Sequence, residues 1–321
     1  MIRLLGLLAT ALASLVLFTA CASHDAAVGS ANLVPAVKAA SGKQTFHFTG
    51  IVQTFQVPTG VDRVTIAAEG AGTPSARGGF VRAAIAVTPG DTLSVSVGGA
   101  PGGMQGGYNG GADGGPSAPG YKLHGAGGAG ASDVRLGGTA LDDRIVVAGG
   151  AGGRGGRGQF LGGPGGESGG LIGARGDNGV TVGYSHGPFH RAQGGAGAGG
   201  ATQRRGGTPG AGGSAYIPGN RGSKGALGVG GGGANDYCQI CSVSYGLIAG
   251  GSGGGGGGGY YGGGGGGSGG NNDSYVGYGR TGIASGGGGG GGSSYAERNA
   301  QNVTIESGRG STGNGLITIS W

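Results

Sequence analysis

The side chains best suited to binding chemistry are arginines, which gather in one part of the chain. Residues 151–225 carry eight Lys and Arg against two acidic residues, whereas the whole chain has a net charge of +6. Guanidinium groups bind carboxylates and phosphates through paired N–H donors. Arg154 and Arg157 are three residues apart, and Arg204 and Arg205 are adjacent. We therefore predict that these four arginines bind an acidic polysaccharide, the phosphate of a lipopolysaccharide or an acidic surface protein; alternatively, their charge only keeps the surface soluble.

Tyrosine is confined to a wider central region of the chain. All 11 tyrosines lie between Tyr108 and Tyr295, and Tyr260 and Tyr261 separate two glycine runs. Tyr, Gly, Ser and Asn together are typical of binding surfaces, because tyrosine offers a large contact area at a small entropy cost. Tyr260 and Tyr261 are therefore candidate ligand-binding residues. The alternative is that their rings only shield the backbone of the glycine segments.

The N-terminus predicts export and a lipid anchor. Arg3 precedes an apolar run over residues 4–18, which is typical of a signal peptide and shorter than the ~20 residues of a spanning helix. The following Phe18-Thr19-Ala20-Cys21 resembles the lipobox of bacterial lipoproteins, in which the cysteine carries the lipid. We expect residues 1–20 to be the signal peptide, Cys21 to be lipidated (with palmitate as one acyl chain) and the Ala- and Ser-rich residues 21–43 to be a tether at the cell envelope or surface. The alternatives are an uncleaved anchor and a secreted chain with a free Cys21.

The two remaining cysteines, Cys238 and Cys241, form a Cys-Gln-Ile-Cys pair. In an oxidising compartment a disulfide between them is expected. A thioredoxin-like redox pair needs a βαβ setting, which the glycine-rich flanks do not offer. Zinc needs two further ligands, and no matching pair is nearby, so we predict no metal site.

Patterns for catalysis are weak. Ser168 lies in a Gly-x-Ser-x-Gly sequence, but 95 glycines among 321 residues make such matches common by chance. His186 and His190 have the spacing of a helical metal pair, but Gly187-Pro188 prevents that helix. The Gly-Gly-Arg-Gly-Gly-Arg segment is typical of RNA-binding chains, but an exported protein does not meet cellular RNA. We predict no enzyme activity, no cofactor and no nucleic-acid partner.

Strand patterns occur on both sides of the glycine-rich region. Apolar residues alternate with others in residues 61–68, 79–87 and 93–97, whereas Ile145-Val146-Val147 is continuous, as in a strand covered on both faces. Further strand-like segments are residues 45–48, 51–57, 303–305 and 317–321. Short strands with turn signals between them predict an all-β fold, a jelly-roll-like β-sandwich. Its frame is expected at residues 44–97, 131–148 and 300–321.

The glycines are concentrated in the remaining part. Between Gly98 and Gly292 lie 81 of the 95, and residues 253–259, 262–267 and 286–292 are pure glycine. An extended helix with three residues per turn has no internal hydrogen bonds, so packed copies could satisfy one another where glycine faces each neighbour. We expect the insertion, residues 98–299, to be a bundle of polyglycine II helices. The alternative is a flexible coil, because ordering glycine costs the most entropy.

Several motifs resemble one family in their order along the chain. Phe48-Thr49-Gly50, residues 53–61, Gly130-Ala131-Ser132-Asp133-Val134-Arg135 and residues 145–150 are similar to the glycine-rich domain family. That family includes the extracellular regions of the anaplastic lymphoma kinase and leukocyte tyrosine kinase receptors and many exported bacterial proteins. The resemblance covers residues 45–321 and implies a tumour-necrosis-factor-like frame with a polyglycine II bundle and a ligand-binding role. No kinase motif is present.

The combined prediction is a non-catalytic cell-surface lipoprotein with one glycine-rich domain at residues 44–321. Its rigid scaffold would present tyrosine and arginine side chains for ligand binding or adhesion. The alternative is a structural spacer or envelope matrix protein whose glycine-rich segments are flexible.

Overall fold

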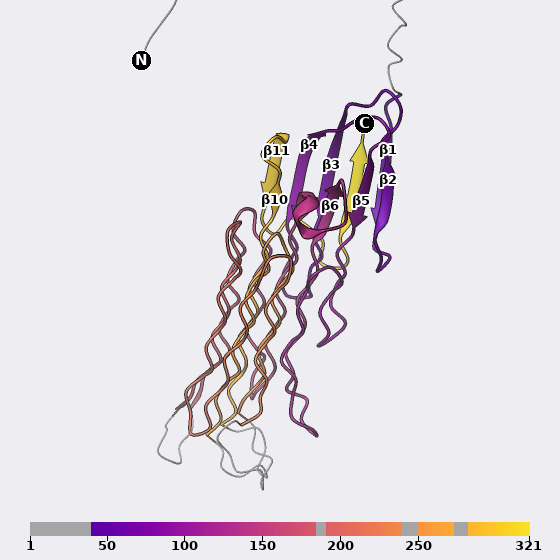
Figure 1. Cartoon of the computed structure of the whole chain (residues 1–321). Helices are drawn as coiled ribbons and strands as arrows, with labels where there is room; N and C mark the ends of the chain where they lie inside the picture. Colours follow the sequence, from indigo (N-terminus) through magenta and orange to yellow (C-terminus); the bar gives the residue numbers. More distant parts are fainter. Residues whose placement is uncertain (1–39, 184–190, 239–248, 273–281) are drawn as a thin grey trace, which may run out of the picture. The chain divides into compact units, whose positions relative to one another are not determined.

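The computed structural model describes residues 40–183, 191–238, 249–272 and 282–321 (Figure 1). All of them belong to one compact unit, Val37–Trp321. The expected signal peptide and most of the tether lie outside the described residues. Regular structure in the described part is antiparallel strand apart from one 3-10 turn, η1 (Leu141–Asp143), which confirms the all-β class. No helix there is both long and apolar enough to span a membrane.

Two five-stranded sheets contain most of the strands. The first has the order β1 (Lys43–His47), β12 (Leu316–Ser320), β3 (Arg63–Glu69), β4 (Phe80–Ala86) and β11 (Gln301–Glu306). The second has the order β10 (Tyr295–Ala296), β7 (Arg144–Ala148), β6 (Ser132–Leu136), β5 (Thr92–Ser96) and β2 (Gln53–Gln56). A separate pair is formed by β8 (Val182–Gly183) and β9 (Arg191–Ala192). The first and last strands of the domain, β1 and β12, are neighbours.

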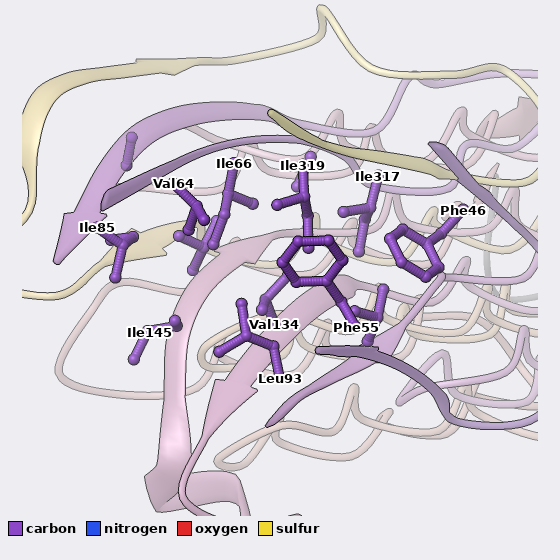
Figure 2. Packing of buried hydrophobic residues seen from close by; sticks show 14 of the residues in the cluster. Phe46, Phe55, Val64, Ile66, Ile85, Leu93, Val134, Ile145, Ile317 and Ile319 are labelled. Carbon is purple, nitrogen blue, oxygen red and sulfur yellow. The ribbon is translucent and has the colours of Figure 1, made fainter. Parts of the chain in front are cut away.

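One hydrophobic core takes side chains from both sheets. In Figure 2, Val64, Ile66 and Ile319 of the first sheet point toward Leu93 and Val134 of the second. The alternation expected in β3 is confirmed, since Val64, Ile66 and Ala68 are fully buried while the residues between them are not. The continuous apolar run of β7 is buried at every position, as predicted for a strand covered on both faces.

The glycine segments have almost no assigned strand, yet their N–H groups are hydrogen-bonded. Along residues 286–292, successive N–H groups donate to three different segments, and N–H groups three residues apart donate to the same segment, at N–O distances of 2.9–3.0 Å. The donor and acceptor pairs are Gly286 to Gly156, Gly289 to Gly153, Gly292 to Gly150, Gly287 to Gly267, Gly290 to Gly264, Gly288 to Asp177 and Gly291 to Ala174. The direction of bonding therefore repeats every three residues.

The carbonyl groups of residues 286–292 repeat in the same way. They accept from three further segments, at residues 163–169, 198–201 and 254–257. In the described part of the chain, this glycine run is thus bonded to six other segments, three as donor and three as acceptor. The segments run side by side in Figure 1.

Close packing, not unusual backbone conformation, requires glycine here. No glycine in residues 286–292 has a positive φ. A methyl group on Gly263 would lie under 3.0 Å from the carbonyl oxygen of Gly290, and one on Gly288 would lie under 3.0 Å from that of Pro164. Real Cβ atoms do not come this close to a neighbouring atom. Gly232 differs, because a methyl there would have only the carbonyl oxygen of Asp113 near it, at 4.0 Å.

Three short strands lie within the range expected to be glycine-rich insertion. These are β8, β9 and β10, and β10 extends the second sheet by pairing Tyr295 with Val147 and Ala296 with Val146. Residues 286–292 lead directly into β10 through Ser293 and Ser294. The glycine run and the second sheet are therefore continuous in the chain at this point.

Candidate ligand-binding site

Two of the four predicted arginines line one shallow hollow, which we call the Arg154 hollow. Its volume is about 220 Å³, and its lining residues are Gly103, His124, Ala126, Arg154, Gly155, Arg157, Leu161 and Gly162. Nη1 of Arg154 donates to the Gly162 carbonyl at 2.9 Å. Arg157 is exposed, and neither arginine forms an ion pair with any described residue. The hollow therefore offers positive charge with no carboxylate to neutralise it.

The sequence Gly-Gly-Arg explains why these two arginines share a surface. The N–H groups of Gly152 and Gly155 donate to one segment, at Gly166 and Gly163, whereas Gly153 donates to Gly255 of another. A methyl group on Gly153 would lie under 3.0 Å from neighbouring carbonyl oxygens. The arginines occupy the one position in three that faces away from these contacts.

Arg204 and Arg205 lie elsewhere, in what we call the Ile172 hollow. Its volume is about 470 Å³, and it is lined by Leu171, Ile172, Thr202, Gln203, Arg204 and Arg205. Both guanidinium groups are exposed and form no ion pair within the described residues. The two hollows share no lining residue, so the four arginines line them as two pairs.

Tyr260 and Tyr261 lie beside strand β10. The Tyr260 ring stacks on Tyr295 with centroids 4.1 Å apart, and Tyr261 meets Tyr260 edge-on at 5.7 Å. The guanidinium of Arg144 lies over the Tyr260 ring, 5.0 Å from its centroid. Ser293 also bonds to the main chain of both tyrosines. Both rings are half-buried, so this cluster covers the end of a glycine run and exposes only part of each ring.

Arg144 is a buried cation that the sequence did not identify. Its Nε donates to Leu141 at 2.7 Å, and its two Nη atoms donate to Gly259 at 3.0 Å and Tyr260 at 3.2 Å, all carbonyl oxygens. Burial lowers the pKa of this guanidinium. It bonds β7 to the glycine run 253–259, so its role is to hold the two parts together.

Asp133 and Arg135 form a buried ion pair on β6, with Nε and Oδ1 2.7 Å apart. Asp133 is 1% exposed and Arg135 9%. Asn109, at φ 67°, donates through Nδ2 to Asp133 at 2.8 Å. Burial by itself would lower the pKa of Arg135, but the hydrogen bond and charge of Asp133 outweigh it and raise that pKa. The sequence signal that could have revealed this pair was two opposite charges two residues apart, on the same face of one strand.

The predicted site residues Cys21 and Cys241 lie outside the described part of the chain, as do His186 and His190, which the sequence had excluded as a helical metal pair. Cys238 is described and is disulfide-bonded. Among the described residues, no group of three or more His, Cys, Asp or Glu side chains could hold a metal ion.

The described surface thus offers two arginine-lined hollows, each with an exposed aliphatic side chain at its wall. Such a surface can attract and bind an anion. Comparisons with known proteins do not identify the ligand, because no protein-family model and no curated protein matches the chain.

Proposed function

We propose that this chain is a non-catalytic cell-surface lipoprotein whose glycine-rich domain binds an acidic polysaccharide at the Arg154 hollow. The observation that carries the proposal is the pair of arginines without carboxylate partners on a backbone fixed by hydrogen bonds. His124 adds an imidazole ring, which can form a further hydrogen bond, to the same hollow. Positive charge concentrated in one place raises the local concentration of an anionic ligand.

The fold that we propose for this function is a jelly-roll-like β-sandwich carrying a bundle of polyglycine II helices, as in the glycine-rich domain family. The shared core of the two sheets supports the sandwich. The three-residue repeat of hydrogen bonding supports the helices, because three residues per turn is the period of this conformation. The bonded backbone also weighs against a flexible spacer.

A rigid backbone favours binding by flexible arginine side chains. Association costs about 0.5–1.5 kcal/mol for each long side chain that it immobilises. Arg154 already has part of its freedom removed by its bond to Gly162. The remaining N–H groups can donate paired hydrogen bonds to a carboxylate. Leu161, exposed at the same hollow, offers an apolar contact for a sugar ring.

The double variant Arg154→Gln/Arg157→Gln tests this site. We expect its affinity for polygalacturonate to fall about tenfold at low salt, since two exposed ion pairs contribute ~1.4 kcal/mol together. The decrease should shrink as salt is added, because salt screens exposed charges. Isothermal titration calorimetry at several salt concentrations measures both effects.

Arg82→Gln is the matched control for that experiment. Arg82 is an exposed arginine on β4 and lines neither hollow. Its loss removes one positive charge, half of what the double variant removes, and should leave the affinity almost unchanged. Equal affinity and equal salt dependence of the double variant and the wild type would exclude the Arg154 hollow as the binding site.

The proposed lipid anchor has its own test. Replacing Cys21 by serine removes the only thiol at the expected lipidation position. We expect the Cys21→Ser chain to lose incorporation of labelled palmitate in the producing cell and to move from the membrane fraction to the soluble exported fraction. A Cys21→Ser chain that still incorporates the label would contradict lipidation at this residue.

A further inference from the structure

The Ile172 hollow combines exposed aliphatic side chains with unpaired positive charge. Leu171 is 55% exposed and Ile172 66% exposed, and both line the hollow together with Arg204 and Arg205. Single exposed aliphatic residues are common on protein surfaces. Two adjacent ones in the same hollow as two arginines, with no acidic residue in the lining, form a surface that is apolar on one side and cationic on the other.

Hydrogen bonds fix both sides of this hollow. Thr202 donates its N–H to the Arg205 carbonyl at 2.9 Å, and its Oγ1 accepts from the N–H groups of Arg204 and Arg205 at 3.2 Å each. This turn leaves both guanidinium groups in solvent. The bridge between Ile172 and Thr202 then sets the aliphatic residues beside the turn.

The turn is also attached to the second sheet. Nε2 of Gln203 donates to the carbonyl of Ser294, one residue before β10, at 3.0 Å. The main chain of Ser294 bonds in turn to Gly170, next to Leu171. Both sides of the hollow therefore share one support, and only the long arginine side chains have to be ordered on binding.

We propose that the Ile172 hollow binds an anionic amphiphile, that is, a phosphate, sulfate or carboxylate head group with an alkyl chain. The two guanidinium groups bind the head group, and Leu171 and Ile172 cover the first methylenes of the chain. The assignment rests on the proposed binding role of the arginines, but it names a ligand class different from the polysaccharide of the Arg154 hollow. The two assignments can therefore fail separately.

The size of the hollow favours a small amphiphile over a protein partner. The hollow has a volume of about 470 Å³ and is open to solvent, so it can cover a head group and the first part of an alkyl chain. A stable protein interface uses about 20–30 residues on each side, whereas this hollow has six lining residues. A bare anion would use the arginines but leave Leu171 and Ile172 in water.

The test titrates dodecyl phosphate, below its critical micelle concentration, into the full chain and measures the affinity by isothermal titration calorimetry. We expect Arg204→Gln/Arg205→Gln to weaken binding at least about tenfold, as for two exposed ion pairs. Leu171→Ser/Ile172→Ser should weaken it by a similar factor. Arg221→Gln, which removes an exposed arginine outside both hollows, is the matched control and should bind like the wild type.

A series of ligands with different alkyl-chain lengths tests the proposal on the wild type, so it does not depend on whether a variant folds. In the wild type, ethyl phosphate should bind more weakly than dodecyl phosphate and inorganic phosphate more weakly still, because each methylene that is buried adds to the affinity. Octyl phosphate should bind almost like dodecyl phosphate, because Leu171 and Ile172 cover only the first methylenes. Leu171→Ser/Ile172→Ser should lose this dependence on chain length. Unchanged thermal unfolding shows that a variant is folded.

Four results would overturn the proposal. Inorganic phosphate binding as tightly as dodecyl phosphate would indicate a bare anion site, and dodecyl maltoside binding as tightly would indicate an apolar patch without charge recognition. Loss of binding in Arg154→Gln/Arg157→Gln alone would place the ligand in the other hollow. Dimers that disappear in Leu171→Ser/Ile172→Ser would assign the surface to a second copy of the chain. Polygalacturonate titrations on the same samples report separately on the Arg154 hollow.

Discussion

Replacing Gly263 by alanine is expected to destabilise the folded protein by about 3 kcal/mol, at the upper end of the usual cost of overpacking. The added methyl group would lie under 3.0 Å from the carbonyl oxygen of Gly290. That oxygen cannot move away freely, because it accepts the N–H of Gly257, while the N–H of Gly290 donates to Gly264. Urea unfolding of wild type and variant measures the change in free energy.

Gly232→Ala is the control, since it makes the same substitution in another glycine run. A methyl group there has free space around it, and the φ of Gly232 is not positive. Alanine restricts the unfolded chain, so we expect the variant to lie between unchanged and about 1 kcal/mol more stable. If Gly263→Ala behaved like this control, the glycine runs would not be closely packed, and the flexible-coil alternative would gain support.

The second large effect is expected from Asp133→Ala, which should lower the free energy of unfolding by about 3–5 kcal/mol, as in other proteins in which one partner of a buried ion pair is removed. The substitution leaves the guanidinium of Arg135 without its carboxylate at a site that is 9% exposed. It also removes one of the two acceptors of Asn109 Nδ2 and leaves only the Ala131 carbonyl. The same urea titration measures the loss.

Two further variants separate the ion pair from general damage to β6. Asp62→Ala removes an exposed carboxylate at the start of the frame and should change the free energy of unfolding by less than about 0.5 kcal/mol. Asp133→Leu/Arg135→Met removes both charges and should be more stable than Asp133→Ala, because no buried charge is left unpaired. A double variant that was as unstable as the single one would show that shape, and not charge, limits this site.

The strands of the frame were predictable because their signal is local. In β3, Val64, Ile66 and Ala68 alternate with less buried residues within one stretch of chain, and the structure buries them as the pattern requires. Strand β10 gave no such signal, since it has only two residues and exists because Tyr295 meets Val147. Contacts between residues this far apart in the chain leave no period in the sequence.

The positions of the arginines also depend on contacts that the sequence does not reveal. Arg154 and Arg157 are three residues apart, and both line the Arg154 hollow. The position of Arg204 and Arg205 beside Ile172 could not be predicted, because it depends on the bridge between Ile172 and Thr202. The buried role of Arg144 depends likewise on carbonyls of Leu141, Gly259 and Tyr260, which only the fold brings together.

The absence of side chains along the glycine runs has a consequence for the heat capacity of unfolding. Exposure of apolar surface raises that heat capacity, and exposure of peptide groups lowers it. Residues 286–292 bury peptide groups against peptide groups and contribute no aliphatic side chain. The heat-capacity change per residue should therefore fall below the usual ~12–15 cal/mol/K, so stability varies less with temperature than in a domain with a conventional core. The same bonding makes the glycine runs largely insensitive to the weakening of hydrophobic contacts on cooling.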